Sequence, residues 1–162
     1  MKKIIIFTFS LLTVLALAGC NKKVQEEQEP MTQIPNPFMD YTSLDEAEKA
    51  VGFDFTMPEG LNGTVDYAYR VMNGEMLEVI CRNAAGEEVA RFRKAKGADD
   101  ISGDYSEYSD VRTDNSLKNI TYRGENGMFT GAIWVDGEYT YALSLEEAMN
   151  LDQVGVIISQ TH

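Results

Sequence analysis

Hydrophobic and polar residues alternate along several segments in the middle of the chain. The first three segments of this kind are residues 65–72, 75–82 and 88–94. Side chains in a strand point to two faces in turn, so a period of two predicts β-strands with one buried face. In the second segment that face carries Leu77, Val79 and Cys81. Asn73-Gly74 predicts a tight hairpin turn after the first segment, because both turn positions require a positive φ.

The same alternation continues in the second half of the chain. Four more expected strands are residues 105–113, 117–122, 128–135 and 138–143. Asn126-Gly127 and Asp136-Gly137 supply turns between them. Because connections this short join only antiparallel neighbours, we expect the strands to form an antiparallel meander.

Two segments carry the signature of a helix start. Ser43-Leu44-Asp45-Glu46 places a hydroxyl at the N-cap and a glutamate three residues later, which is a capping box, and Gly52 ends the predicted helix. Ser144-Leu145-Glu146-Glu147-Ala148 repeats the pattern and predicts a C-terminal helix. The order of helix, strands and helix predicts an α+β domain over residues 38–162. We expect a single antiparallel sheet, a meander of about six to seven strands, with both helices packed on one face.

A different pattern opens the chain. Met1-Lys2-Lys3 precedes an apolar run that is shorter than the ~20 residues of a membrane span and is typical of a secretory signal peptide. Leu17-Ala18-Gly19-Cys20 then resembles the lipobox of bacterial lipoproteins. That resemblance implies that residues 1–19 are cleaved off and that the Cys20 thiol carries diacylglycerol with fatty acyl chains such as palmitate. The alternative is an ordinary signal peptide that contains a cysteine, or an uncleaved anchor.

Residues 20–37 are expected to be a flexible tether between the anchor and the domain. They hold three of the four prolines in the chain. The first half of the stretch is polar and charged, so it buries too little apolar surface to fold by itself. With lipid on Cys20, Cys81 has no intrachain partner, and we expect no structural disulfide.

The chain is acidic, with 26 Asp and Glu against 14 Lys and Arg, a formal charge of -12 and a pI near 4.4. We expect no nucleic-acid partner, because phosphate binding requires clustered basic residues. An anionic membrane repels such a body, so the lipid is expected to hold it at the membrane. Two cysteines and one histidine offer few metal ligands, and no glycine loop resembles a phosphate site. We therefore expect no cofactor and no metal.

Candidate catalytic residues are sparse. Cys81 lies on the apolar face of a predicted strand, where a thiol is most often a small buried hydrophobe. The single histidine is His162, the last residue, and chain ends usually fray. Ser102 precedes Gly103, but no strand-to-helix nucleophile elbow surrounds it. We therefore expect no catalytic serine–histidine or cysteine–histidine pair.

Residues 99–110 are rich in Asp and Ser, whose oxygens are suitable calcium ligands. An EF-hand alignment that starts at Asp100 places Ser102 at the third position and Val111 at the twelfth, where a glutamate is required. A solvated turn that enters a strand is the favoured interpretation, and cation binding stays an open alternative. Asp100 and Asp104 are the acids on which hydrolysis of a polysaccharide would be tested first.

Aromatic residues recur in the predicted strands: Tyr67, Tyr69, Tyr105, Tyr122, Trp134, Tyr139 and Tyr141. Residues two apart share a sheet face, so the rings predict either a platform for sugars or peptides, or cross-strand packing. Packing explains the pattern with fewer assumptions. Arg91 and Arg93 share a face in the same way and are expected to project outward and pair with acids on neighbouring strands.

Three segments together resemble an uncharacterised domain of small lipoproteins and envelope proteins of Gram-positive anaerobes. They are residues 38–55, which contain Ser-Leu-Asp-Glu-Ala-Glu-Lys-Ala-Val-Gly-Phe, residues 93–105 and residues 132–144. The resemblance would extend over most of residues 36–160. It implies an antiparallel sheet with packed helices, and it implies no activity or catalytic residues.

These features favour a lipid-anchored extracytoplasmic domain that binds an envelope protein or glycan and is not an enzyme. The alternatives are an envelope hydrolase that uses acidic residues on a polysaccharide, and a small-ligand carrier whose sheet curls around an apolar cavity. The lipobox fits one-membrane and two-membrane envelopes alike, and the family resemblance favours the outer face of a Gram-positive plasma membrane. The pattern leaves the oligomeric state open.

We predict that Cys20→Ser abolishes lipid attachment, because a serine hydroxyl does not replace the thiolate that accepts the diacylglyceryl group. Cells that express either chain are grown with alkyne-tagged palmitate, and label on the protein is measured together with its distribution between membrane and medium. Cys81→Ser is the matched control and should label like the wild type. Continued labelling of the Cys20→Ser chain would contradict the lipobox interpretation.

Overall fold

The structure, a computed structural model, describes residues 36–59, 61, 63–116 and 118–162. Its elements in chain order are β1 (Phe38–Tyr41), α1 (Leu44–Val51), β2 (Asp66–Met72), β3 (Met76–Arg82), β4 (Glu88–Lys96), β5 (Asp110–Asp114), β6 (Asn119–Glu125), β7 (Met128–Asp136), β8 (Tyr139–Asn150) and α2 (Leu151–Gln160). The predicted signal peptide, Cys20 and most of the predicted tether lie outside the described residues.

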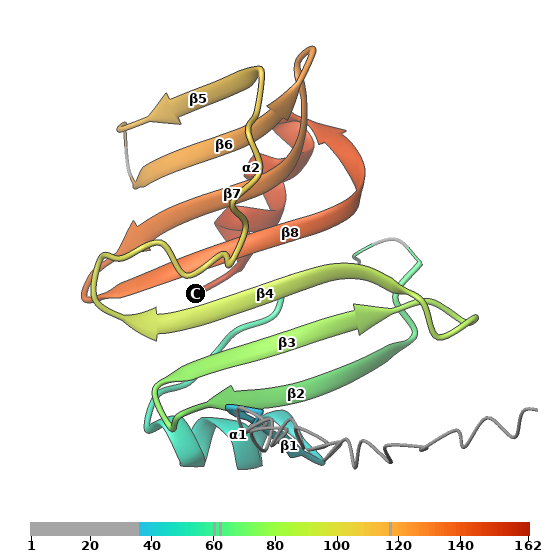
Figure 1. Ribbon diagram of the computed structural model, residues 1–162, viewed down its shortest axis with the longest axis vertical. Helices are drawn as coiled ribbons and strands as arrows, with labels where there is room; N and C mark the ends of the chain where they lie inside the picture. Colours follow the sequence, from blue (N-terminus) through green and yellow to red (C-terminus); the bar gives the residue numbers. More distant parts are fainter. Residues whose placement is uncertain (1–35, 60, 62, 117) are drawn as a thin grey trace, which may run out of the picture. The chain divides into compact units, whose positions relative to one another are not determined.

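All eight strands belong to one antiparallel sheet with the order β1-β2-β3-β4-β8-β7-β6-β5 (Figure 1). Strands β1 to β4 form one meander and β5 to β8 form a second, and the two meet where β4 pairs with β8. That pairing runs from Ala90 opposite Leu145 to Lys96 opposite Tyr139. The predicted α+β class, with a single antiparallel sheet and two helices, is confirmed. The predicted single meander was wrong, because β8 returns to the middle of the sheet.

Positive φ angles lie at the predicted tight turns. Between β2 and β3, Asn73 has a φ of 55° and Gly74 a φ of 74°. Between β6 and β7, Asn126 has a φ of 52° and Gly127 a φ of 79°. Asparagine and glycine tolerate this left-handed conformation best, so both predicted hairpins form. The sequence pattern does not predict β1, because four residues are too few to show a period of two.

Helix α1 begins and ends where its capping residues predict. The Ser43 hydroxyl accepts a hydrogen bond from the Glu46 N–H at 3.3 Å. Gly52 ends the helix with a φ of 76°, and its N–H donates to the Glu48 carbonyl. Ala47 is fully buried, and Leu44 and Val51 pack against the core. Helix α1 therefore turns this apolar side toward the sheet and its charged residues toward solvent.

The predicted start of the second helix was wrong. Residues 144–148 belong to β8, and α2 begins only at Leu151. Asn150 is its N-cap, and the side chains of Asn150 and Gln153 form the capping box. Leu145 is buried and pairs with Ala90 of β4. This burial within the sheet outweighs the local helix signal of Ser144 and the acids that follow it.

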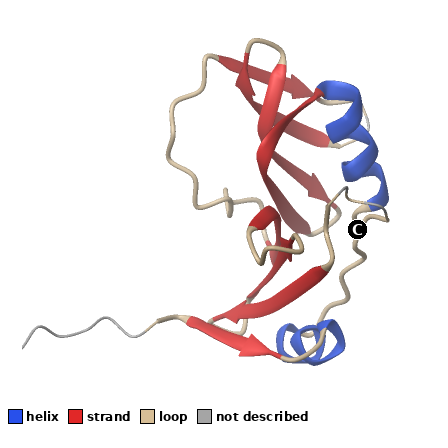
Figure 2. Ribbon diagram, turned by 90° about the vertical axis from the view of Figure 1, so that its right-hand side faces the viewer, coloured by secondary structure: helices blue, strands red, loops and turns tan. Residues whose placement is uncertain are grey.

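Both helices cover the same face of the sheet (Figure 2). They enclose one continuous core with the strands, to which α1 contributes Ala47 and α2 contributes Val154, Ile157 and Ile158. The largest fully buried side chain in this core is that of Trp134, whose ring stacks on the Tyr141 ring with 5.2 Å between centroids. Aromatic side chains therefore supply much of the buried apolar area.

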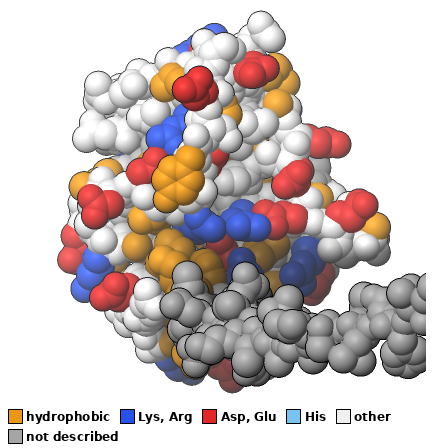
Figure 3. Space-filling model, in the orientation of Figure 1, with side chains coloured by type: hydrophobic (Ala, Val, Ile, Leu, Met, Phe, Trp, Pro, Cys, Tyr) orange, Lys and Arg blue, Asp and Glu red, His pale blue; other side chains and the backbone are white. Residues whose placement is uncertain are grey.

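The opposite face of the sheet is charged, and residues 97–109, which join β4 to β5, run along it (Figures 1 and 2). Figure 3 shows Lys and Arg side chains in a band across this face. Arg70, Glu78 and Arg93 lie in direct register across β2, β3 and β4. Arg70 Nε and Arg93 Nε each donate to the Glu78 carboxylate at 2.7 Å.

Glu78 is 0% exposed, and its carboxyl group is contacted by the guanidinium groups of Arg70, Arg91 and Arg93. Arg93 also donates hydrogen bonds to the carbonyl of Ile101 at 3.0 Å and to that of Ser102. These bonds hold residues 97–109 against the charged face of the sheet. The prediction that Arg91 and Arg93 pair with acids on neighbouring strands is confirmed. The expectation of exposed pairs was wrong, because the Glu78 carboxylate is enclosed by its arginines and by this segment.

We predict that Glu78→Gln lowers the free energy of unfolding by about 3 kcal/mol, because breaking a buried ion pair leaves its partner charges uncompensated. The measurement is urea unfolding followed by circular dichroism. The matched control is Glu138→Gln at an exposed turn, which should change the free energy by less than about 0.5 kcal/mol. Equal stability of the two variants would show that the buried carboxylate is not needed to neutralise the arginines.

Candidate functional site

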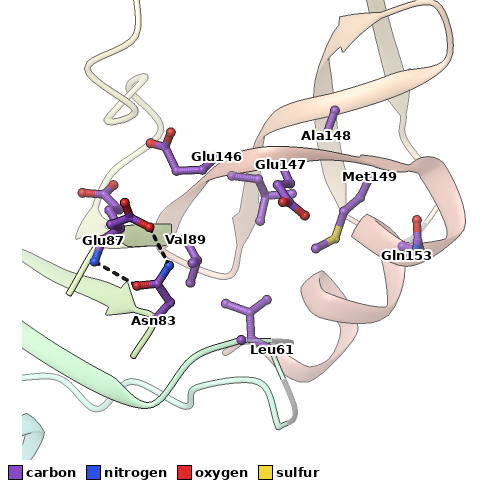
Figure 4. A pocket seen from close by; sticks show the side chains of 12 residues that line it. Leu61, Asn83, Glu87, Val89, Glu146, Glu147, Ala148, Met149 and Gln153 are labelled. Atoms are coloured by element: carbon purple, nitrogen blue, oxygen red, sulfur yellow. Dashed lines mark hydrogen bonds between the residues drawn. The ribbon is translucent and has the colours of Figure 1, made fainter. Parts of the chain in front are cut away.

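The two meanders separate at one end of the β4–β8 pair. Pairing between β4 and β8 stops at Ala90 and Leu145, although β4 extends back to Glu88 and β8 runs on to Asn150. A cleft of about 930 Å³ lies between the two diverging strand ends (Figure 4). Its volume is about twice that of another cavity, of about 470 Å³, between α1 and the β2–β3 turn.

One wall of the cleft is the turn that joins β3 to β4. The Asn83 side-chain oxygen accepts hydrogen bonds from the N–H groups of Ala85, at 2.9 Å, and Glu87, at 3.0 Å. Its amide nitrogen donates to the Glu87 carboxylate at 3.0 Å (Figure 4). This Asx-type turn fixes the backbone that carries Glu87 and Glu88 at the rim of the cleft.

The other wall is an irregular part of β8. Phe129 of β7 is opposite Met149, whereas Gly131 is opposite Ser144, so four residues of β8 face the single Thr130. Residues 146–148 have no ladder partner on β4 or on β7 in the described sheet. A bulge of this size turns the strand out of the ladder and exposes its backbone.

Four carboxylates and an apolar floor line the cleft. Glu87, Glu88, Glu146 and Glu147 stand on the two walls, and Leu61, Val89, Leu145 and Met149 are the larger apolar lining residues. Figure 4 shows how most of these side chains lie around the cleft. The described lining contains no lysine or arginine. Of the four acids, Glu88 pairs with Arg91 beside the cleft at 2.6 Å. We call this feature the glutamate cleft; its chemistry suits a positively charged ligand with apolar parts.

The sequence interpretation missed this site. It assigned Glu146 and Glu147 to the first turn of a helix, and it treated Glu87 and Glu88 as part of a hairpin. The available signal was a pair of consecutive glutamates at 87–88 and another at 146–147. Nothing in the sequence brings those pairs together, because they are joined only by the register of β4 with β8.

The acidic segment 99–110 uses its carboxylates to fold on itself. Asp100 accepts hydrogen bonds from the N–H and the hydroxyl of Ser102, at 2.9 and 2.6 Å, and from Arg123 at 2.7 Å. Asp104 accepts from the Tyr108 hydroxyl, and from the Ser106 N–H at 2.9 Å. Within the described residues, no group of three or more His, Cys, Asp or Glu side chains is arranged to hold a metal ion.

These contacts set the protonation of the two acids that a hydrolase would use. Burial raises the pKa of Asp100, but the hydrogen bonds from Ser102 and Arg123 together outweigh it, and the pKa lies below its usual value. The Tyr108 hydrogen bond is the main cause that lowers the pKa of Asp104. Both groups are ionised at neutral pH, whereas a general acid requires a raised pKa.

Cys81, Ser102 and His162 lie in different parts of the described structure and do not form a catalytic group. Cys81 is fully buried on the helix side of the sheet, and burial raises the pKa of its thiol to about 12. Ser102 lies in the segment along the opposite face, where its hydroxyl donates to Asp100. His162 is not frayed: its backbone exchanges hydrogen bonds with Thr56, although its side chain is exposed.

The aromatic residues do not form a single exposed platform. Trp134, Tyr122 and Tyr141 are buried in the core. Tyr67 and Tyr69 stack on each other at 6.4 Å between centroids. The side chain of Tyr105, 97% exposed, stands by itself in the acidic segment. Packing between strands therefore accounts for most of the rings that the sequence singles out.

Lys94 is a buried cation that the sequence interpretation missed. It is 6% exposed, lies over the rings of Phe53, Tyr139 and Tyr141, and donates to the Asp54 carbonyl at 2.6 Å. Desolvation lowers the pKa of Lys94. Aromatic faces attract the ammonium, so it stabilises the link between the segment after α1 and the sheet.

No described helix is both long and apolar enough to cross a membrane. Comparison with known proteins gave no match to a protein-family model, to a curated protein or to a solved structure.

We predict that Cys81 does not react with a thiol reagent in the folded protein, because the buried thiol stays protonated at neutral pH and is shielded from solvent. The reagent is Ellman's reagent, applied to the full chain with Cys20→Ser so that Cys81 is the only thiol. One thiol should react only after denaturation. Rapid reaction of the folded chain at pH 7 would contradict the buried assignment.

Proposed function

We propose that this protein is a lipid-anchored, extracytoplasmic binding module of the cell envelope and that it is not an enzyme. The observation that carries the binding role is the glutamate cleft, where four carboxylates and an unpaired length of strand face a space of about 930 Å³. That volume lies at the upper end of the range of ordinary ligand pockets, roughly 300–1,000 Å³.

The proposed location comes from the first twenty residues. The lipobox-like Leu17-Ala18-Gly19-Cys20 supports lipid attachment at Cys20, and the predicted tether of residues 20–37 would hold the domain away from the bilayer. The resemblance to uncharacterised lipoproteins of Gram-positive anaerobes favours the outer face of a plasma membrane. An envelope protein or an envelope glycan is the proposed class of partner.

Hydrolysis of a polysaccharide is the less favoured alternative. The lowered pKa values of Asp100 and Asp104, and their hydrogen bonds within one segment, suit a structural role better than proton transfer. A carrier of small apolar ligands is also less favoured. The space between sheet and helices is occupied by packed side chains, among them Phe92, Trp134 and Ile158.

We predict that a partner is retained by the cleft and not by the acidic surface in general. Native membranes containing the full lipidated chain are cross-linked and solubilised, the chain is captured, and bound partners are identified by mass spectrometry. The Glu146→Lys/Glu147→Lys chain should lose the partner, because both substitutions reverse a charge on one wall.

The matched control is Glu75→Lys/Glu138→Lys, which makes the same charge change at two exposed turns outside the cleft. It should retain the partner. Equal loss from both variants, or retention by both, would contradict the assignment of binding to the cleft.

A further inference from the structure

The open strand edge inside the glutamate cleft indicates that its ligand has an extended peptide backbone. Residues 146–148 lie in β8 but have no ladder partner on either neighbouring strand of the described sheet. Across the cleft, β4 residues Glu88 and Val89 lie beyond the last pair with β8. Unpaired strand backbone offers N–H and C=O groups in the spacing that an extended peptide matches.

The residues that line the cleft indicate which kinds of side chain such a peptide would carry. Glu146 and Glu147 are exposed on the β8 wall, and neither forms a salt bridge within the described residues. Glu87 and Glu88 stand on the facing wall. Lysine or arginine side chains from a bound strand would meet carboxylates on both sides, while apolar side chains would meet Leu61, Val89 and Met149 (Figure 4).

We infer that the glutamate cleft binds an extended, basic segment of a partner protein, which adds a short strand to the open edge of β8. This inference rests on the proposed binding function and names the class of partner for that site. The cleft of about 930 Å³ is large enough for several residues, which distinguishes it from a site for a single ion. Successive side chains of the bound strand alternate between the acidic walls and the apolar floor.

The test measures binding of a synthetic peptide to the purified full chain in detergent. The probe is a fluorescent, amidated octapeptide in which lysine alternates with valine, and fluorescence anisotropy gives the dissociation constant. The Glu146→Gln/Glu147→Gln chain should bind about tenfold more weakly than the wild type, because two of the four carboxylates lose their charge. Glu75→Gln/Glu138→Gln is the matched control and should bind within about twofold of the wild type. Circular dichroism checks that all variants are folded.

Two further ligands separate strand pairing from simple charge attraction. The same octapeptide with alternate backbone amides methylated keeps its charges but loses the N–H groups that face β8. It should bind at least about tenfold more weakly. Spermine carries positive charge without a peptide backbone and should compete only weakly.

Several results would overturn the inference. Tight competition by spermine would assign the cleft to small cations, and unchanged binding of the methylated peptide would exclude strand pairing. Equal loss in the control variant would mean that the peptide binds the acidic surface in general. Tighter peptide binding after Lys22→Gln/Lys23→Gln would identify the occupant as the chain's own predicted tether. If the octapeptide fails while the cross-linked partner still depends on Glu146 and Glu147, the binding function stands and the basic-strand ligand is wrong.

Discussion

The pairing of β4 with β8 is the central interaction of this domain. It joins the two meanders and pairs residues that are far apart in the sequence, as Ala90 and Leu145 show. The same register sets Lys94 directly opposite Tyr141. Where the pairing stops, the strand ends diverge and leave the glutamate cleft. The site is therefore a consequence of how far one strand pair extends.

Buried charged side chains are stabilised in different ways on the two faces of the sheet. On the helix face, Lys94 is surrounded by aromatic rings and one carbonyl, so its ammonium keeps favourable electrostatic partners after losing water. On the other face, Glu78 is neutralised by Arg70 and Arg93, which occupy the positions directly across from it. Both arrangements tolerate few substitutions, because removing one member leaves an uncompensated charge in a dehydrated place.

Carboxylates have two distinct roles in the described structure. In residues 99–110, Asp100 and Asp104 accept hydrogen bonds from their own segment and from Arg123, so they serve folding. In the glutamate cleft, Glu146 and Glu147 have no salt-bridge partner among the described residues and face a cavity. Three of the five acids in residues 99–110, namely Asp100, Asp104 and Asp110, are thus occupied by internal contacts. The acids that line the cleft come from two short pairs that the sequence does not connect.

Several local features of this protein follow from residues that are neighbours in the chain. Ser43 and Gly52 fixed α1, Asn73-Gly74 and Asn126-Gly127 fixed two hairpins, and alternation fixed most strands, because these signals act over a few residues. The fold as a whole, by contrast, determined that residues 144–148 belong to β8 and that Glu78 is buried. It also decided that two distant glutamate pairs share one cleft. The physical reason is that strand pairing between remote segments and burial of their side chains outweigh local preferences, and neither is encoded in a short stretch of sequence.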